Sequence, residues 1–127
     1  MPTTSIIFAA IAAFFHVLFF LMESIFWMNP KVYKTFGVKS TEEAEQFKVS
    51  FFNQGFYNLF LAVGVFAGIY LLQLEQAVAG TTLILFCCAS MLAASVVLFF
   101  SKPGMMRGVI IQGLCPLIAI ATYLFCA

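Results

Sequence analysis

Residues 14–27 read FFHVLFFLMESIFW, an apolar run that contains one histidine, His16, and one carboxylate, Glu23. The run lies inside a longer segment, residues 5–28, that is long enough to cross the ~30 Å hydrocarbon layer of a bilayer as a helix. Ionisable side chains are costly inside such a segment and are often functional there. The stretch therefore predicts a transmembrane helix with a polar site within it.

The composition of the whole chain also indicates a membrane protein. Of its 127 residues, 64% are hydrophobic and 9% are charged, whereas charged residues make up about 25% of a soluble domain. We expect a single integral membrane domain over residues 1–127. The net charge of +1 gives no indication of a nucleic-acid partner. The four cysteines lie in apolar runs without metal-binding spacing, so neither a metal nor a cofactor is expected.

Three more apolar segments follow the first one. The predicted fold class is all-α, a four-helix transmembrane bundle. The expected spans are residues 5–28, 49–72, 81–100 and 105–126.

A short helix is expected between the first two spans. Asn29 is a good N-cap, Pro30 suits the first helical position, and Gly37 suits the position just after the helix. The residues between them mix apolar and basic side chains, which is typical of a helix that lies in the membrane interface. Residues 40–43, STEE, form a capping box that opens the second long helix before it enters the bilayer.

The basic residues predict the orientation of the chain. All six lie in or beside two loops, residues 29–48 and 101–107. Cytoplasmic loops carry an excess of Lys and Arg, so both loops are expected in the cytoplasm and both termini outside.

Polar residues at matching depths in the spans predict a pocket open to the cytoplasmic side. His16 and Glu23 lie seven residues apart on one face of the first helix, two turns apart along it. Trp27 follows a turn later, where an interfacial anchor is the alternative interpretation. The expected ligand-binding residues are His16, Glu23, Trp27, Asn53, Gln54, Tyr57, Asn58 and Gln112.

These residues also carry a resemblance to a known family. The sequence H…MESIFW, the following proline and FGV, and then NQGFYN resemble the domain of unknown function 1304 family over nearly the whole chain. The resemblance implies a four-span protein of the bacterial inner membrane and implies no activity. The positions that match are His16, Glu23, Trp27, Asn53, Gln54, Gly55, Tyr57 and Asn58.

Three functions remain open from the sequence. The first is binding or transport of a small hydrophobic or amphipathic molecule, with Glu23 as the titratable group. The second is an intramembrane enzyme acting on a lipid-like or isoprenoid substrate, with His16 and Glu23 as its catalytic acid and base. The third is a structural or assembly subunit, because Gly64 and Gly68 form a GxxxG motif through which copies of the chain could associate.

Overall fold

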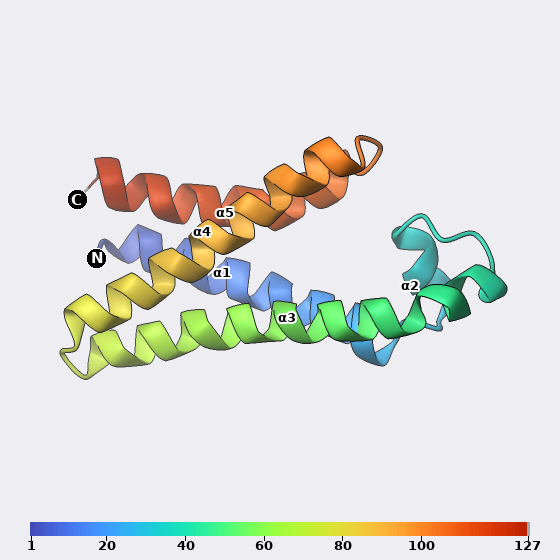
Figure 1. Ribbon diagram of the computed structural model, residues 1–127. Helices are drawn as coiled ribbons and strands as arrows, with labels where there is room; N and C mark the ends of the chain where they lie inside the picture. The colour runs from blue at the N-terminus through green and yellow to red at the C-terminus, as the bar shows by residue number, and fades with distance from the viewer. Residues whose placement is uncertain (127) are drawn as a thin grey trace. The chain divides into compact units, whose positions relative to one another are not determined.

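The structure is a computed structural model in which residues 1–126 are described, and every element in that range is helical (Figure 1). Within these described residues, four segments are long and apolar enough to cross a membrane: α1 together with η1, and α3, α4 and α5. The expected all-α class is thereby confirmed, and the chain is a multi-pass membrane protein. The elements in order are α1 (Thr3–Phe20), the π-helical turn η1 (Leu21–Ile25), α2 (Pro30–Thr35), α3 (Thr41–Gln73), α4 (Ala77–Ser101) and α5 (Met106–Phe125).

The helix boundaries differ from the expected spans at two ends in particular: α4 begins at Ala77 instead of residue 81, and the first helix ends early. The helical segment ends at Ile25 instead of residue 28, because its last turn widens into η1 and the chain then bends away. The helix α3 is one continuous element of 33 residues. At 1.5 Å per residue it is about 50 Å long, well beyond the thickness of the hydrocarbon layer. Its first turn is capped as expected, since the backbone N–H of Glu43 donates to Ser40 Oγ (3.2 Å).

The chain divides into two compact units. We call residues 1–15 with 61–126 the bundle unit, and residues 16–60 the site unit. The bundle unit contains the beginning of α1, the second half of α3, and α4 and α5. The site unit contains the end of α1, η1, α2 and the first half of α3.

Small residues allow the helices of the bundle unit to pack closely. Gly64 and Gly68 both face α4 of the same chain, where a Cβ on Gly64 would collide with Cys87 Sγ. A Cβ on Gly68 would lie 2.6 Å from Ile84 Cγ1 and 2.9 Å from the carbonyl oxygen of Gly80. The GxxxG motif therefore has a partner helix within the chain.

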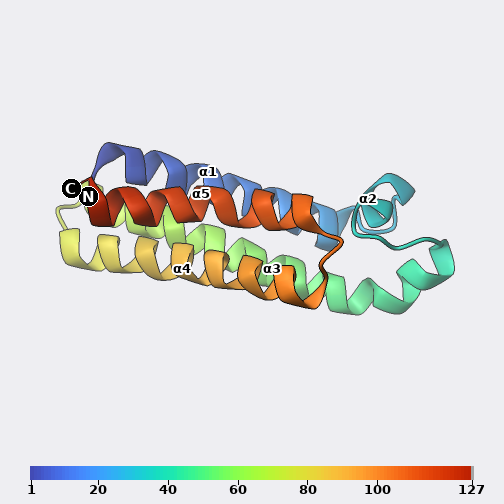
Figure 2. The same cartoon turned by 90° about the horizontal axis from the view of Figure 1, so that it is seen from above.

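The beginning of α1 and the end of α5 lie side by side in both views of the ribbon (Figures 1 and 2). Ser5 Oγ and Thr122 Oγ1 share a hydrogen bond of 2.7 Å between these two helices. An edge-to-face contact of Phe14 with Phe66, with centroids 5.3 Å apart, joins α1 to α3. Polar and aromatic pairs of this kind hold membrane helices together, since apolar packing gains little over contact with lipid tails.

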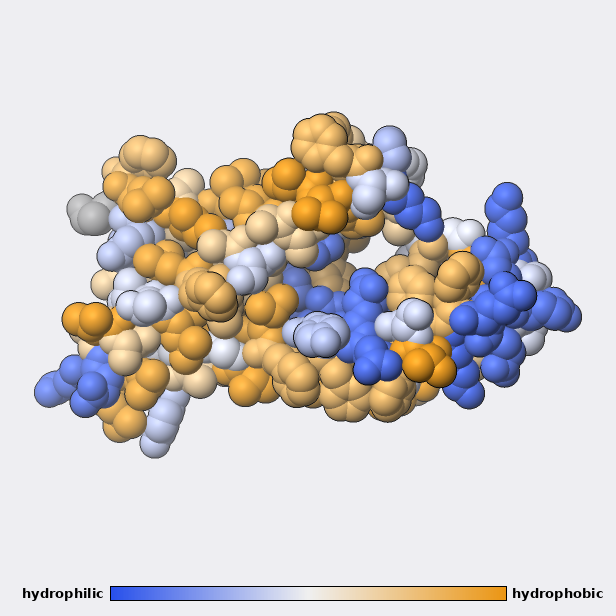
Figure 3. Space-filling model, in the orientation of Figure 1, coloured by the Kyte–Doolittle hydropathy of each residue, from blue (hydrophilic) through white to orange (hydrophobic). Residues whose placement is uncertain are grey.

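Hydrophilic side chains gather over α2 and the beginning of α3 on the face shown in Figure 3. Exposed charged residues there are Lys31, Lys34, Glu42, Glu45 and Lys48. The later part of α3 instead exposes large apolar side chains such as Phe60 and Val63. This contrast fits a helix that begins in water and continues into lipid.

The contact of α3 with α4 generates a stability prediction. Gly68→Leu should lower the free energy of unfolding by about 1–3 kcal/mol, because backbone atoms of α4 must move to admit the side chain. Gly104→Leu is the matched control, since nothing lies within 4 Å of a Cβ at Gly104. Melting in detergent measures both variants, and an equal effect of the two would contradict this packing.

Candidate ligand pocket at Glu23

The π-helical turn η1 determines where Glu23 points. The backbone N–H of Phe26 donates to the carbonyl oxygen of Leu21 (2.8 Å), five residues earlier. A π turn inserts an extra residue into the helix, and such turns are frequent at functional sites. Glu23 lies at the centre of this turn with only 2% of its surface exposed.

A close approach of α3 holds the π turn in place. Ser24 Oγ donates a hydrogen bond to the carbonyl oxygen of Phe52 (2.7 Å). A Cβ on Gly55 would collide with Ser24 Oγ and would lie 3.2 Å from the carbonyl oxygen of Phe20. The glycine of NQGFYN is therefore needed for close packing between α3 and η1.

The carboxyl group of Glu23 is held at one of its two oxygens. Asn58 Nδ2 donates to Glu23 Oε1 at 2.7 Å. Oε2 is also buried, and it has no hydrogen-bond partner within residues 1–126. A buried polar atom without a partner carries a desolvation cost of about 1–3 kcal/mol, and more if charged. The geometry thus fixes the carboxyl group and leaves one acceptor unused.

Trp27 is the centre of a small apolar cluster after η1. Its Nε1–H donates to the carbonyl oxygen of Ala44 (2.9 Å), and its ring stacks on Phe51 with centroids 4.0 Å apart. Tyr33 and Val38 are buried in the same cluster. The interpretation of Trp27 as an interfacial anchor is wrong, because the residue is only 2% exposed and its N–H is bound within the protein.

The helix α2 covers this cluster. As expected, Asn29 Oδ1 accepts from the backbone N–H of Lys31 (3.0 Å), and Gly37 ends the helix with a φ of 83°. The apolar side chains Val32 and Phe36 pack against the cluster around Trp27. The segment between α1 and α3 is thus folded onto the first turns of α3.

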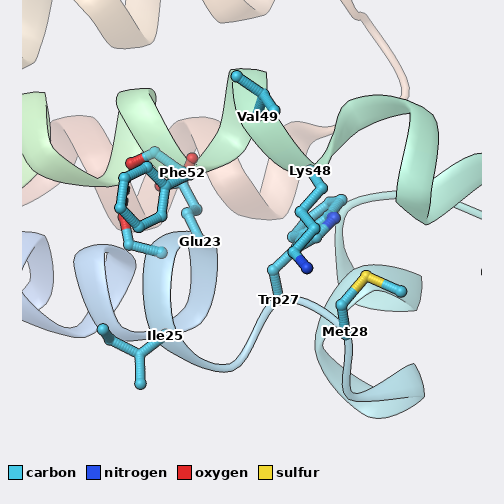
Figure 4. A pocket seen from close by; sticks show the side chains of 8 residues that line it. Glu23, Ile25, Trp27, Met28, Lys48, Val49 and Phe52 are labelled. Carbon is cyan, nitrogen blue, oxygen red and sulfur yellow. Dashed lines mark hydrogen bonds between the residues drawn. The ribbon is translucent and has the colours of Figure 1, made fainter.

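A pocket of about 420 Å³ lies between η1, the following loop and the first half of α3 (Figure 4). Glu23 on η1 and Lys48 on α3 both line it, and Lys48 and Val49 are exposed, so the pocket is open at that side. Most of its wall is apolar. The lining residues are Glu23, Ser24, Ile25, Trp27, Met28, Lys48, Val49 and Phe52.

The structure brings three of the eight expected ligand-binding residues together. Glu23 and Trp27 line the pocket, and Asn58 bonds to Glu23. His16 is buried on α1, where its ring meets Phe19 edge-on with centroids 5.0 Å apart, and it does not line the pocket.

The other four expected residues lie outside the lining. Asn53, Gln54 and Tyr57 are exposed on α3, with Tyr57 70% exposed. The amide of Asn53 donates to the carbonyl oxygen of Val49 in its own helix (2.8 Å). Gln112 is half-buried on α5, in the bundle unit.

Sequence reasoning missed six residues of the pocket, because it selected polar side chains at matching depths. The apolar wall carried no distinguishing signal among so many apolar residues. The missed residues are Ser24, Ile25, Met28, Lys48, Val49 and Phe52.

Four long apolar helices and a carboxyl group buried beside a pocket define a small polytopic α-helical membrane protein. A family model described as "Protein of unknown function (DUF1304)" matches residues 10–124. The chain belongs to this family, which confirms the resemblance found in the sequence. No curated protein and no solved structure matches the chain.

The contact of Ser24 with Gly55 generates a second stability prediction. Gly55→Ala should destabilise the protein by about 1–3 kcal/mol, because its methyl group meets the Ser24 side chain. In a Ser24→Gly background the same substitution should cost clearly less, since the collision with Ser24 is removed. Melting of the two single variants and the double variant measures the coupling. Strict additivity would contradict the contact.

Proposed function

We propose that this protein binds or transports a small hydrophobic or amphipathic molecule in the pocket at Glu23. One observation supports this most directly. A buried carboxyl group lines the pocket, and one of its oxygens has no partner within residues 1–126. A carboxylate in a membrane-spanning segment is costly and marks a substrate or ion path by default.

The size and lining of the pocket favour ligand binding over a purely structural role for Glu23. Ligand pockets are commonly about 300–1,000 Å³, with mostly apolar walls and a few polar groups. This pocket, at about 420 Å³, lies within that range. The bond between Glu23 and Asn58 uses a single carboxyl oxygen, so a glutamine would serve the same structural purpose.

We further propose that the protein lies in a bacterial inner membrane with both termini outside. The basic residues that support this orientation lie on α2, in the loop before α3, near the beginnings of α3 and α5, and just after α4. The loops at residues 29–48 and 101–107 would then face the cytoplasm. The pocket opens near Lys48 and so would be reached from that side.

The two alternative functions have less support. An acid and base pair acting on one substrate needs both groups in the same pocket, and His16 is not among the lining residues. An assembly subunit needs an available GxxxG face, and Gly64 and Gly68 face α4 of the same chain.

Native mass spectrometry of the protein released in mild detergent tests the binding proposal. A co-purifying small molecule is expected on the wild type and should be lost, by at least about tenfold in occupancy, on Glu23→Gln. This substitution removes the ionisable group but keeps an oxygen that accepts from Asn58, so the fold is expected to survive. Glu75→Gln is the matched control, because Glu75 is exposed in the turn after α3.

Two outcomes would contradict the binding proposal. One is a molecule retained equally by the wild type and by Glu23→Gln. The other is the absence of any bound molecule in both forms, combined with equal melting temperatures. Either result would leave the buried carboxyl group with a purely structural role.

Reporter fusions test the orientation. Alkaline phosphatase, which is active only outside the cytoplasm, should be active when fused after residue 126 and inactive when fused in the turn near Lys102. The opposite pattern would contradict the proposed orientation, and it would place the mouth of the pocket on the external side.

A further inference from the structure

We infer that the ligand of the Glu23 pocket is a small zwitterion with an apolar body. Its ammonium group would donate to Glu23 Oε2 and its anionic group would meet the Lys48 ammonium. This inference rests on the proposed function and adds the chemical class of the ligand.

The first argument is the state of the Glu23 carboxyl group. Asn58 occupies Oε1, and Oε2 is buried without a partner within residues 1–126. Among the polar residues lining the pocket, Ser24 already donates its hydroxyl hydrogen to Phe52. A ligand that supplies an N–H donor, and preferably a positive charge, would satisfy Oε2. Hydrogen bonds between charged partners are about twice as strong as neutral ones.

The second argument is the position of Lys48. The bond from Ser24 to Phe52 places the π turn beside residue 52 of α3. Lys48 precedes Phe52 by four residues, which is about 6 Å along the helix. The acid and the base therefore lie at different levels of one pocket, with Lys48 nearer the hydrophilic beginning of α3 (Figures 3 and 4).

The third argument is the balance of charge and apolar surface. One acidic and one basic side chain line the pocket, so a ligand with a single charge would be attracted by only one of them. A molecule with both charges, separated by a few atoms, matches both. The apolar walls formed by Ile25, Val49 and Phe52 would take its hydrocarbon part.

Two sources supply this chemistry: the headgroup of an ethanolamine phospholipid and a free apolar amino acid. Two sets of probes with matched apolar parts separate them. The lipid set is lysophosphatidylethanolamine, lysophosphatidylglycerol and an alkylamine. The solute set is phenylalanine, 3-phenylpropionate and phenethylamine. In each set the zwitterion comes first, followed by a molecule that carries only the anion and one that carries only the ammonium group.

Titration of each probe, followed by native mass spectrometry in non-ionic detergent, measures the preference. The wild type should bind the zwitterion of one set at least about tenfold more tightly than both of its partners. Glu23→Gln should abolish the preference over the anion. Lys48→Met should abolish the preference over the ammonium compound. Lys39→Met, at an exposed residue outside the pocket lining, should leave both preferences unchanged.

Each outcome decides the inference. A preference within either set that depends on Glu23 and Lys48 supports it, and the set concerned identifies the source. Equal binding of all three members, or a preference that survives both substitutions, overturns the zwitterion while the pocket still binds ligands. Binding of no probe also overturns the zwitterion, and if no molecule co-purifies either, the proposed function fails as well. Lys48 is exposed, so Lys48→Met keeps the test valid even if Glu23→Gln unfolds.

Discussion

The hydrogen bond from Asn58 to Glu23 allows a carboxyl group to be buried inside a membrane-spanning segment. A carboxyl group inside a membrane-spanning segment loses its hydration and must find donors within the protein. Asn58 supplies one donor at 2.7 Å. The bond joins residues 35 positions apart, so it also ties the end of the first span to the middle of α3. The second oxygen has no such partner within residues 1–126, and that asymmetry gives the pocket its chemical character.

This bond depends on local backbone geometry that two small residues provide. The π turn presents Glu23 to α3, and Gly55 has no side chain to keep α3 away. Because α3 approaches η1 closely, Ser24 Oγ can donate a hydrogen bond to the carbonyl oxygen of Phe52. Trp27 lies just after the π turn and packs against apolar side chains of α2. This contact holds the segment between the first span and α3 in place. The pocket is therefore a consequence of how one helix ends and how closely the next one approaches it.

Most of the fold could be predicted from the sequence, because the signals are local. Apolar length predicts the four spans, and the helix caps at Asn29 and Ser40 act within a few residues of themselves. The π turn was missed, since its hydrogen bond from Phe26 to Leu21 carries no sequence signature. The alternative interpretation of Trp27 as an interfacial anchor failed for a related reason. A tryptophan near the end of a span has the same local pattern whether its ring faces lipid or a folded loop.

The candidate site was likewise predictable only where the signal lies in the local sequence. The sequence by itself determined that Glu23 and Asn58 are candidate site residues, because polar side chains in apolar segments are costly and stand out. Only the tertiary structure decided that these two residues bond to each other, that His16 lies outside the pocket lining, and that Lys48 lies within it. The physical reason is that the polarity of a side chain is a property of one residue and can be recognised in the sequence. A shared pocket depends on the approach and rotation of two helices, and those are set by long-range contacts such as that of Gly55 with Ser24.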